Sequence, residues 1–130
     1  MKIREPIPED IKRFILRSID SVPHLEAILL LRYDPKIEWD GTTMAQRLYI
    51  SEKKATELLT DLCAAGFASK EKDGFMYFYN PISSELKELI NRLAEIYTKN
   101  LIEVTNLIHS KTNKQAQTFG DAFKWQKEKD

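Results

Sequence analysis

Apolar residues between positions 42 and 62 recur three or four places apart, which is the spacing of one face of a helix. Ser51 divides the run, because serine favours a helix start, and Gly66 marks a helix stop. Thr42 or Thr43 is the expected cap of the first helix. On the second helix the inward residues are Ala55, Leu58, Leu59 and Leu62, and the outward ones are Lys53, Thr56, Glu57, Thr60 and Ala64. The pattern predicts two helices joined by a sharp turn.

Two β-prone runs follow the second helix, at residues 67–71 and 75–79. Lys72-Asp73-Gly74 lies between them, and an Asp-Gly pair favours a tight hairpin turn because glycine accepts a positive φ. Residues 36–39 also alternate between polar and apolar side chains. We expect them to form a single edge strand paired with the hairpin, with Trp39 covering the edge of the core.

Helical periodicity continues on both sides of this segment. Residues 8–20 predict an amphipathic helix that packs on the protein's own core or swaps into a second copy. Residues 25–33 are the most apolar helical stretch and predict a buried helix. The expected parts are a helical arm at 1–20, a central domain at 21–80, a long helix at 81–110, and a helical and charged tail at 111–130 that carries Phe119 and Phe123.

The helix expected over residues 81–110 has apolar positions spaced alternately four and three apart, which is typical of a seam between helices. Such a helix would be about 40 Å long, longer than the central domain can cover. Its far half therefore needs a second copy of the chain or the N-terminal arm. The expected dimerisation residues are Leu86, Ile90, Leu93, Tyr97, Asn100, Val104 and Leu107. Asn100 would set the register of a dimer or lie at a solvent-facing break.

The arrangement resembles the winged helix-turn-helix superfamily, and most of all bacterial transcriptional regulators of the MarR or PadR kind. The matching residues are Ala45, Leu48, Ile50, Ser51, Ala55, Leu59, Leu62, Gly66 and Phe67, with Asp73-Gly74 in the wing. The resemblance covers about residues 25–110 and includes a long helix after the wing. It implies a mainly α fold with a small β-hairpin (α+β), and a homodimer that places two helices in successive major grooves of double-stranded DNA.

The resemblance also implies which residues contact DNA. Base edges would be faced by Lys53, Thr56, Glu57 and Thr60. Phosphates would be met by Thr42, Thr43, Gln46, Arg47 and Lys54, and from the wing by Lys70 and Lys72. Acidic residues outnumber lysines on the same helix, since Glu52, Glu57 and Asp61 are there as well. We therefore expect weak DNA binding, or binding strengthened by avidity in a dimer.

Charge supports a second interpretation. The chain has 20 basic and 20 acidic residues, whereas a nucleic-acid-binding protein usually has a basic excess. Residues 21–80 contain 7 basic and 9 acidic residues, a net charge of −2. The alternative function is a winged-helix protein-interaction module with little or no DNA affinity, in which the acidic second helix contacts a protein.

The sequence shows no residue spacing typical of a catalytic or metal site. His24 and His109 lie on different expected helices, without a Cys, Asp or Glu at metal-ligand spacing beside them. Cys63 is the only cysteine, and we expect a half-buried, inert thiol. We expect no enzymatic activity and no cofactor. The resemblance further implies a cleft for a small aromatic or apolar effector between the winged domain and the dimer helices. Four aromatic residues would line this cleft, unless they belong to the core: Tyr33, Trp39, Tyr49 and Tyr97.

Hydropathy bears on location. The longest purely apolar run, Ala27 to Leu31, is far shorter than the roughly 18 residues that span a bilayer. The first residues are charged and do not resemble the apolar core of a signal peptide. We therefore expect a cytoplasmic protein that contacts no membrane.

Overall fold

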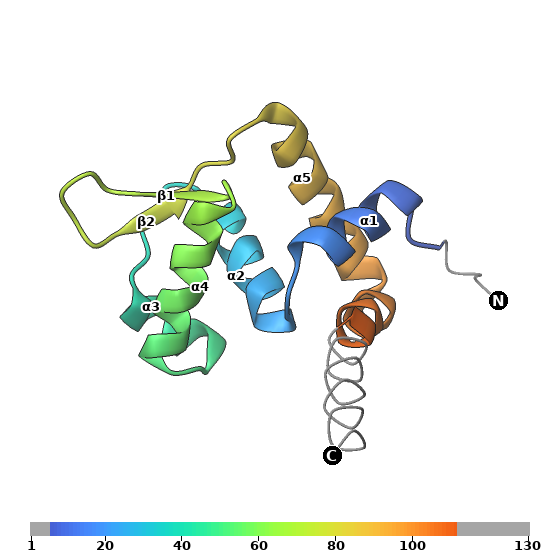
Figure 1. Cartoon of the computed structure of the whole chain (residues 1–130), viewed down its shortest axis with the longest axis horizontal. Helices are drawn as coiled ribbons and strands as arrows, with labels where there is room; N and C mark the ends of the chain where they lie inside the picture. The colour runs from blue at the N-terminus through green and yellow to red at the C-terminus, as the bar shows by residue number, and fades with distance from the viewer. Residues whose placement is uncertain (1–5, 112–130) are drawn as a thin grey trace, which may run out of the picture. The chain divides into compact units, whose positions relative to one another are not determined.

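The computed structural model of the chain describes residues 6–111. Its elements are α1 (Glu9–Ser18), α2 (Val22–Tyr33), α3 (Gly41–Leu48), α4 (Glu52–Ala64), β1 (Ala68–Lys70), β2 (Tyr77–Tyr79) and α5 (Ser84–Lys99), followed by a helix at residues 101–111 (Figure 1). Two compact units are present: unit 1 is Met1–Val22 with Ile96–Asp130, and unit 2 is Pro23–Glu95. The predicted fold class is confirmed at the coarse level, because the described chain is mainly helical with a two-stranded antiparallel hairpin.

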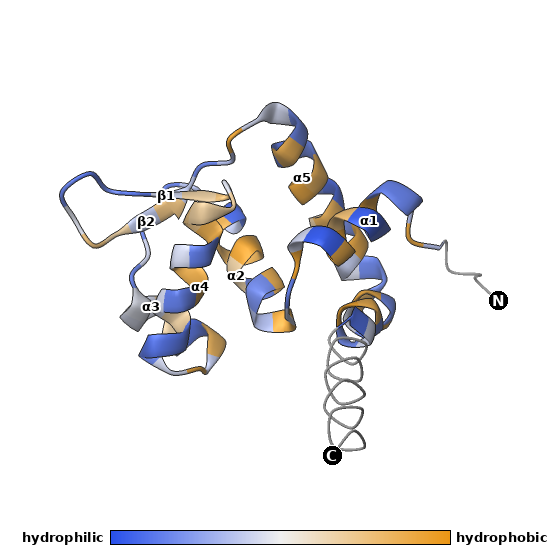
Figure 2. Ribbon diagram, in the orientation of Figure 1, coloured by the Kyte–Doolittle hydropathy of each residue, from blue (hydrophilic) through white to orange (hydrophobic). Residues whose placement is uncertain are grey.

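The core of unit 2 collects apolar side chains from three helices and the start of the hairpin. Figure 2 shows apolar residues along α2, whereas the loop between β1 and β2 is mostly hydrophilic. The fully buried large side chains include Leu25, Ile28, Leu31, Met44, Leu59, Leu62 and Phe67. Helices α3 and α4 pack directly on one another. A Cβ at Gly41 would collide with Thr56 Oγ1, so the glycine allows the start of α3 to lie close to α4.

Hydrogen-bonded caps begin both of these helices. Asp40 caps α3, because its Oδ1 accepts from the Thr43 N–H at 2.8 Å and its own N–H donates to Thr43 Oγ1 at 3.1 Å. The prediction that Thr42 or Thr43 is the cap was therefore wrong. Thr43, three residues after the cap, is instead the partner of Asp40 in both hydrogen bonds of this capping box. Ser51 caps α4 as predicted, with its Oγ accepting from the Lys54 N–H at 3.1 Å.

Left-handed residues end both helices. Tyr49 ends α3 with φ 57° and ψ 45°, a left-handed backbone conformation that residues other than glycine adopt at a cost of roughly 1–2 kcal/mol. Gly66 follows α4 with φ 86°. Its N–H donates to the Cys63 carbonyl at 3.1 Å, and the Phe67 N–H donates to the Leu62 carbonyl at 2.9 Å, which together form a Schellman motif. The predicted helix stop at Gly66 is confirmed.

The hairpin is shorter in its strands and longer in its loop than predicted. The register pairs Ala68 with Tyr79, Ser69 with Phe78 and Lys70 with Tyr77. The Glu71 N–H donates to the Met76 carbonyl at 2.9 Å, which leaves a loop at residues 72–75. Gly74 does not have a positive φ. The predicted hairpin with its turn around Asp73-Gly74 is confirmed, whereas the expected positive φ at Gly74 was wrong, because a four-residue loop reverses the chain without the left-handed glycine that a two-residue turn needs.

Trp39 provides a third partner for the hairpin, at a single position. It forms an antiparallel bridge with Tyr77, with the Trp39 N–H donating to the Tyr77 carbonyl at 2.8 Å. The Tyr77 N–H returns a bond to the Trp39 carbonyl at 2.6 Å. Trp39 is buried, as predicted. Pairing with the hairpin is thus confirmed, although it is limited to this bridge instead of extending over residues 36–39.

The predicted unbroken helix over residues 81–110 is interrupted. Helix α5 ends at Lys99, and a new helix covers residues 101–111. At the break the Asn100 N–H donates to the Ile96 carbonyl at 2.7 Å and its carbonyl accepts from the Val104 N–H at 3.0 Å. Asparagine is a weak helix former, since its side chain competes for backbone hydrogen bonds. Asn100 is only 8% exposed, so the break lies at Asn100 but does not face solvent.

The predicted dimerisation residues do not form a free seam. Four of the seven are buried in the single chain, namely Ile90, Leu93, Asn100 and Val104, whereas Leu86, Tyr97 and Leu107 are half-buried. Residues 96–111 belong to the same compact unit as α1, and Lys111 Nζ contacts Asp20 Oδ1 at 3.1 Å. The far half of the helix expected over residues 81–110 was predicted to need either a second copy of the chain or the N-terminal arm. It shares a compact unit with the N-terminal arm.

The C-terminal tail and the possibility of a membrane span were both addressed by the sequence. The proposed tail with Phe119 and Phe123 lies outside the described residues. Within residues 6–111, the helices include none that is long and apolar enough to cross a membrane.

Candidate nucleic-acid interface

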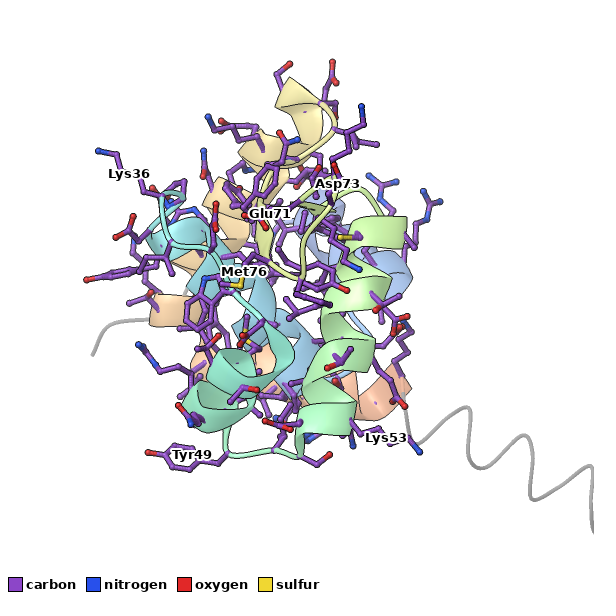
Figure 3. The ribbon with its side chains drawn as sticks, turned by 90° about the vertical axis from the view of Figure 1, so that its left-hand side faces the viewer. Lys36, Tyr49, Lys53, Glu71, Asp73 and Met76 are labelled. Carbon is purple, nitrogen blue, oxygen red and sulfur yellow. The ribbon has the colours of Figure 1, made fainter. Side chains whose placement is uncertain are left out.

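Helix α4 separates a buried row of side chains from an exposed polar row. The buried row is the predicted Ala55, Leu58, Leu59 and Leu62, and Leu59 has no solvent exposure. The exposed row is the predicted Lys53, Thr56, Glu57, Thr60 and Ala64, and we include in it the adjacent exposed Lys54. Both faces of the helix are thus oriented as the periodicity predicted, and Figure 3 shows Lys53 projecting from the start of α4.

Lys53 and Lys54 have free ammonium groups. Within the described chain, neither side chain forms a hydrogen bond or an ion pair, although the backbone N–H of Lys54 is held by Ser51. Thr60 Oγ1 donates to the Thr56 carbonyl at 2.8 Å, which leaves the Thr60 hydroxyl oxygen available as an acceptor. The two cations can therefore approach a phosphate without first breaking an intramolecular pair.

Carboxylates occupy the starts of both helices. Glu52 Oε1 accepts from Thr42 Oγ1 at 2.6 Å, which links the first turn of α4 to the first turn of α3. Hydrogen bonds from Thr43 lower the pKa of Asp40, so this carboxyl remains ionised. Thr42 and Thr43 are exposed but already engaged in these contacts. Because negative side chains complement these helix ends, the helix starts are poorer phosphate sites than the resemblance implies.

The hairpin contributes cations and acids in equal number. Lys70 Nζ lies 5.8 Å from the centre of the Tyr77 ring, and Lys72 is exposed in the loop beside Asp73. Next to the hairpin loop, a side-chain hydrogen bond with Glu71 and the repulsion between the two carboxyl groups raise the pKa of Glu38. The hairpin would therefore add phosphate contacts at two lysines without a strongly positive field.

A small pocket of about 250 Å³ separates the hairpin from the two helix starts. Its lining residues are Asp40, Gly41, Thr42, Glu52, Thr56, Lys70, Phe75 and Tyr77. Phe75 is itself 83% exposed. The pocket brings together residues from α3, α4 and the hairpin, so the DNA contacts predicted at Thr42, Thr56 and Lys70 lie on one side of unit 2.

Arg47 lies apart from this pocket. Together with Leu48 it lines a groove of about 350 Å³ between α3 and α2, whereas Gln46 on the same helix is exposed. The residues from α2 are Glu26, Leu29, Leu30 and Tyr33. Sequence reasoning missed this groove, although the adjacent Leu29 and Leu30 followed by Tyr33 on one helix are a detectable apolar signal.

The aromatic residues predicted to line an effector cleft have different environments in unit 2. Tyr33 lines the groove and is 85% exposed, Tyr49 is 95% exposed in the turn after α3, and Trp39 is buried beside Tyr77. Figure 3 shows the Tyr49 side chain extending away from that turn. These three rings do not line a common pocket.

The remaining candidate groups are the two histidines and the cysteine. In the described part of the chain, no three His, Cys, Asp or Glu residues are arranged to hold a metal ion. His24 is buried and meets the Phe67 ring edge-on, with 6.5 Å between ring centres, whereas His109 is exposed. Burial raises the pKa of the half-buried Cys63 thiol, which opposes formation of the reactive thiolate.

The combination on α4 and the hairpin is a polar, mixed-charge surface presented by a helix, with its chemistry limited to hydrogen bonding and ion pairing. Comparison with known proteins adds no relative: no family model matches the chain, and neither a curated protein nor a solved structure does so.

Proposed function

We propose that unit 2 is a winged helix-turn-helix that binds double-stranded DNA, and that the chain acts as a homodimeric transcriptional regulator. The observation that carries the proposal is the exposed polar row of α4 with its two unpaired lysines. This row lies on the side of α4 opposite its buried leucines, and α3 and the hairpin flank it. A helix presented in this way is the element that enters the major groove in helix-turn-helix proteins.

In this arrangement the exposed row of α4 faces the base edges. Thr56 and Thr60 offer hydroxyl groups, and Glu57 offers an acceptor for the N4 amino group of cytosine. Lys53 and Lys54 contact the bases or phosphates beside the first turn of α4. The hairpin lysines, Lys70 and Lys72, contact flanking phosphates. We leave Arg47 out of this set, because it lines the groove between α2 and α3.

The charge of this surface sets the expected strength of binding. Four lysines that each neutralise one phosphate give a slope of about −3.6 for log K against log salt in one copy. Glu52, Glu57 and Asp61 are exposed on α4 and oppose the approach of phosphate. Affinity is therefore low in one copy and depends on the second copy for avidity.

The test is a fluorescence anisotropy titration of the full chain with a mixed-sequence duplex of about 30 base pairs, which accommodates two half-sites. The titration is run at about 50 mM and about 200 mM salt. The variant Lys53→Glu with Lys54→Glu is expected to bind at least about tenfold more weakly and to have a shallower salt slope. The matched control reverses two exposed lysines elsewhere, Lys36→Glu with Lys87→Glu, and is expected to retain affinity.

Figure 3 shows why this control is informative, since Lys36 and Lys53 lie on opposite sides of the view. Equal losses in the two double variants would attribute the binding to overall charge and contradict the proposal. Undetectable binding of the wild-type chain at about 50 mM salt, where phosphate contacts are strongest, would contradict it as well.

One observation favours a second function. The three exposed acids of α4 and the Asp40 carboxylate at the start of α3 suit a basic protein partner better than they suit phosphate. The chain would then be a winged-helix protein-interaction module. A wild-type chain that fails to bind DNA at about 50 mM salt, yet binds a lysine-rich peptide through Glu57 and Asp61, would favour this alternative.

A further inference from the structure

The groove between α2 and α3 remains without a role in DNA binding. We call it the α2–α3 groove, and its residues are Glu26, Leu29, Leu30, Tyr33, Arg47 and Leu48. It has a volume of about 350 Å³ and belongs entirely to unit 2. None of its residues is on α4 or the hairpin, so occupation of the groove leaves the exposed row of α4 uncovered.

The floor of the α2–α3 groove is apolar and incompletely covered. Leu29, Leu30 and Leu48 are half-buried, whereas Tyr33 is 85% exposed. Tyr49, which follows Leu48 directly, is 95% exposed. Adjacent exposed aromatic and aliphatic side chains, bordered by charges, are typical of protein interaction sites. Burial of these side chains would supply the hydrophobic part of an association free energy.

Two charges of opposite sign line the same groove. Glu26 comes from α2 and Arg47 from α3, and within the described chain neither side chain forms an ion pair or a hydrogen bond. Each charge is therefore available to a partner. The groove thus presents one free acid and one free base beside an apolar floor.

This charge pattern is complementary to itself. When two copies are related by a twofold axis, every contact between different residues occurs twice. If residue i of the first copy contacts residue j of the second, then residue j of the first copy contacts residue i of the second. Glu26 of each copy can then meet Arg47 of the other, and the leucines and Tyr33 face their own equivalents. A uniformly acidic or basic peptide would satisfy only one of the two charges and would oppose the other.

We infer that a second copy of this chain occupies the α2–α3 groove and that this contact forms the homodimer. The inference rests on the dimer of the proposed function but not on its DNA affinity. This contact replaces the predicted dimer seam between residues 86 and 107, because four of the seven seam residues are buried in the single chain. It also gives Arg47 a role in association instead of phosphate contact.

The test is sedimentation equilibrium of the full chain without DNA, over roughly 1 to 100 µM. The wild-type chain is expected to be a dimer in this range. Arg47→Glu and Glu26→Arg are each expected to weaken the dimer at least about tenfold, because each places like charges opposite one another twice. Combining the two substitutions restores opposite charges across the interface and is expected to restore the dimer.

Two matched controls change charge outside the groove. Lys36→Glu reproduces the charge change of Arg47→Glu, and Glu88→Arg reproduces that of Glu26→Arg; both residues are exposed, and both variants are expected to dimerise as the wild type does. Tyr33→Ser tests the apolar floor without charge. Because Tyr33 is largely exposed, its replacement leaves the fold intact and is expected to weaken the dimer.

Several results would overturn the inference. A wild-type chain that remains monomeric at about 100 µM would do so. A dimer unaffected by either single charge reversal, or unaffected by Tyr33→Ser, would show that another surface makes the contact. Failure of the double reversal to dimerise, with an unchanged circular dichroism spectrum, would also refute the pairing of Glu26 with Arg47. Because DNA is absent, none of these outcomes depends on whether the chain binds DNA.

Discussion

The exposed row of α4 and the α2–α3 groove are both surfaces of unit 2, yet their chemistry differs. The row is polar, with two free lysines, threonine hydroxyls and Glu57 on one helix. The groove combines an apolar floor with one acid and one base from two helices. A polar row gains affinity when each group finds a fixed counterpart, as on nucleic acid, whereas an apolar groove gains it by excluding water. The difference indicates separate partners for the two surfaces.

The largest expected effect is a loss of stability at the buried face of α4, because both surfaces depend on the folding of unit 2. Leu59 has no solvent exposure, so Leu59→Ala is expected to lower the free energy of unfolding by about 2–5 kcal/mol. Thr60→Ala, one residue further on the exposed face, is expected to change it by less than about 0.5 kcal/mol. Urea denaturation measures both. Similar losses in the two variants would contradict the assigned inner and outer faces.

A smaller loss is expected at the cap of α3, which lies between the two surfaces in the chain. Asp40→Ala removes the acceptor for the Thr43 N–H and is expected to cost about 1 kcal/mol. Asp40→Asn retains a cap without the charge, and is expected to bind duplex DNA more tightly than the wild type does. Denaturation and anisotropy measure the two effects. A weaker DNA complex in Asp40→Asn would mean that the carboxylate does not oppose phosphate.

The same cap makes a prediction about pH. The folded-state pKa of Asp40 is lowered from its ordinary value of 3.8, so the unfolded chain binds the proton more tightly. The stabilising contribution of the Asp40 carboxylate is therefore fully present above the ordinary pKa and is lost as the pH falls through the lowered one. A plot of unfolding free energy against pH should be flatter for Asp40→Asn in that acidic window. An unchanged slope would exclude this contribution.

A modest gain in stability is expected in the turn that leads from the groove to α4. Tyr49 has a left-handed backbone and an exposed side chain, so Tyr49→Gly relieves strain without loss of packing. We expect the free energy of unfolding to rise by about 0.5–1 kcal/mol, because the relief of about 1–2 kcal/mol of backbone strain exceeds the cost of the larger backbone entropy that glycine loses on folding. Thermal denaturation provides the measurement. Destabilisation would reveal contacts of the Tyr49 ring that its exposure does not indicate.

The smallest effect on stability is expected next to the hairpin loop, where Glu38 meets Glu71. The pKa of Glu38 is raised from 4.5 by its hydrogen bond to Glu71 and by repulsion between the carboxyl groups, so the folded chain holds this proton more tightly. Stability is then lost as the pH rises from the ordinary value through the raised one. Glu38→Gln removes the repulsion and should be slightly more stable than the wild type at pH 7 but not at pH 4. A gain of the same size at both values would contradict the charge explanation.

The features that could be predicted from the sequence depend on residues close together in the chain. Ser51 caps the helix that begins at the next residue, and the turn at Gly66 ends it with hydrogen bonds from the N–H groups of Gly66 and Phe67. The four inward residues of α4 follow from its periodicity alone. Such signals act within a few residues, so no long-range contact can override them easily.

The features that were missed depend on the choice between similar local options or on distant contacts. Asp40 and Thr43 both suit a cap, and their reciprocal bonds decide between them only in three dimensions. Apolar periodicity continues through Asn100, so it gives no sign of the break, and the unit that includes this break also contains α1 from the opposite end of the chain. The α2–α3 groove joins Glu26 to Arg47, which lie on separate helices.

The central claim is that DNA contacts the exposed row of α4 and leaves the α2–α3 groove free. The most direct measurement is a two-dimensional ¹⁵N–¹H spectrum of the full chain, recorded as a short duplex is added at about 50 mM salt. We expect the amide signals of residues 52–61 and 70–76 to shift and those of residues 26–33 to stay in place. Shifts concentrated in residues 26–33, or no shifts at all, would contradict the central claim.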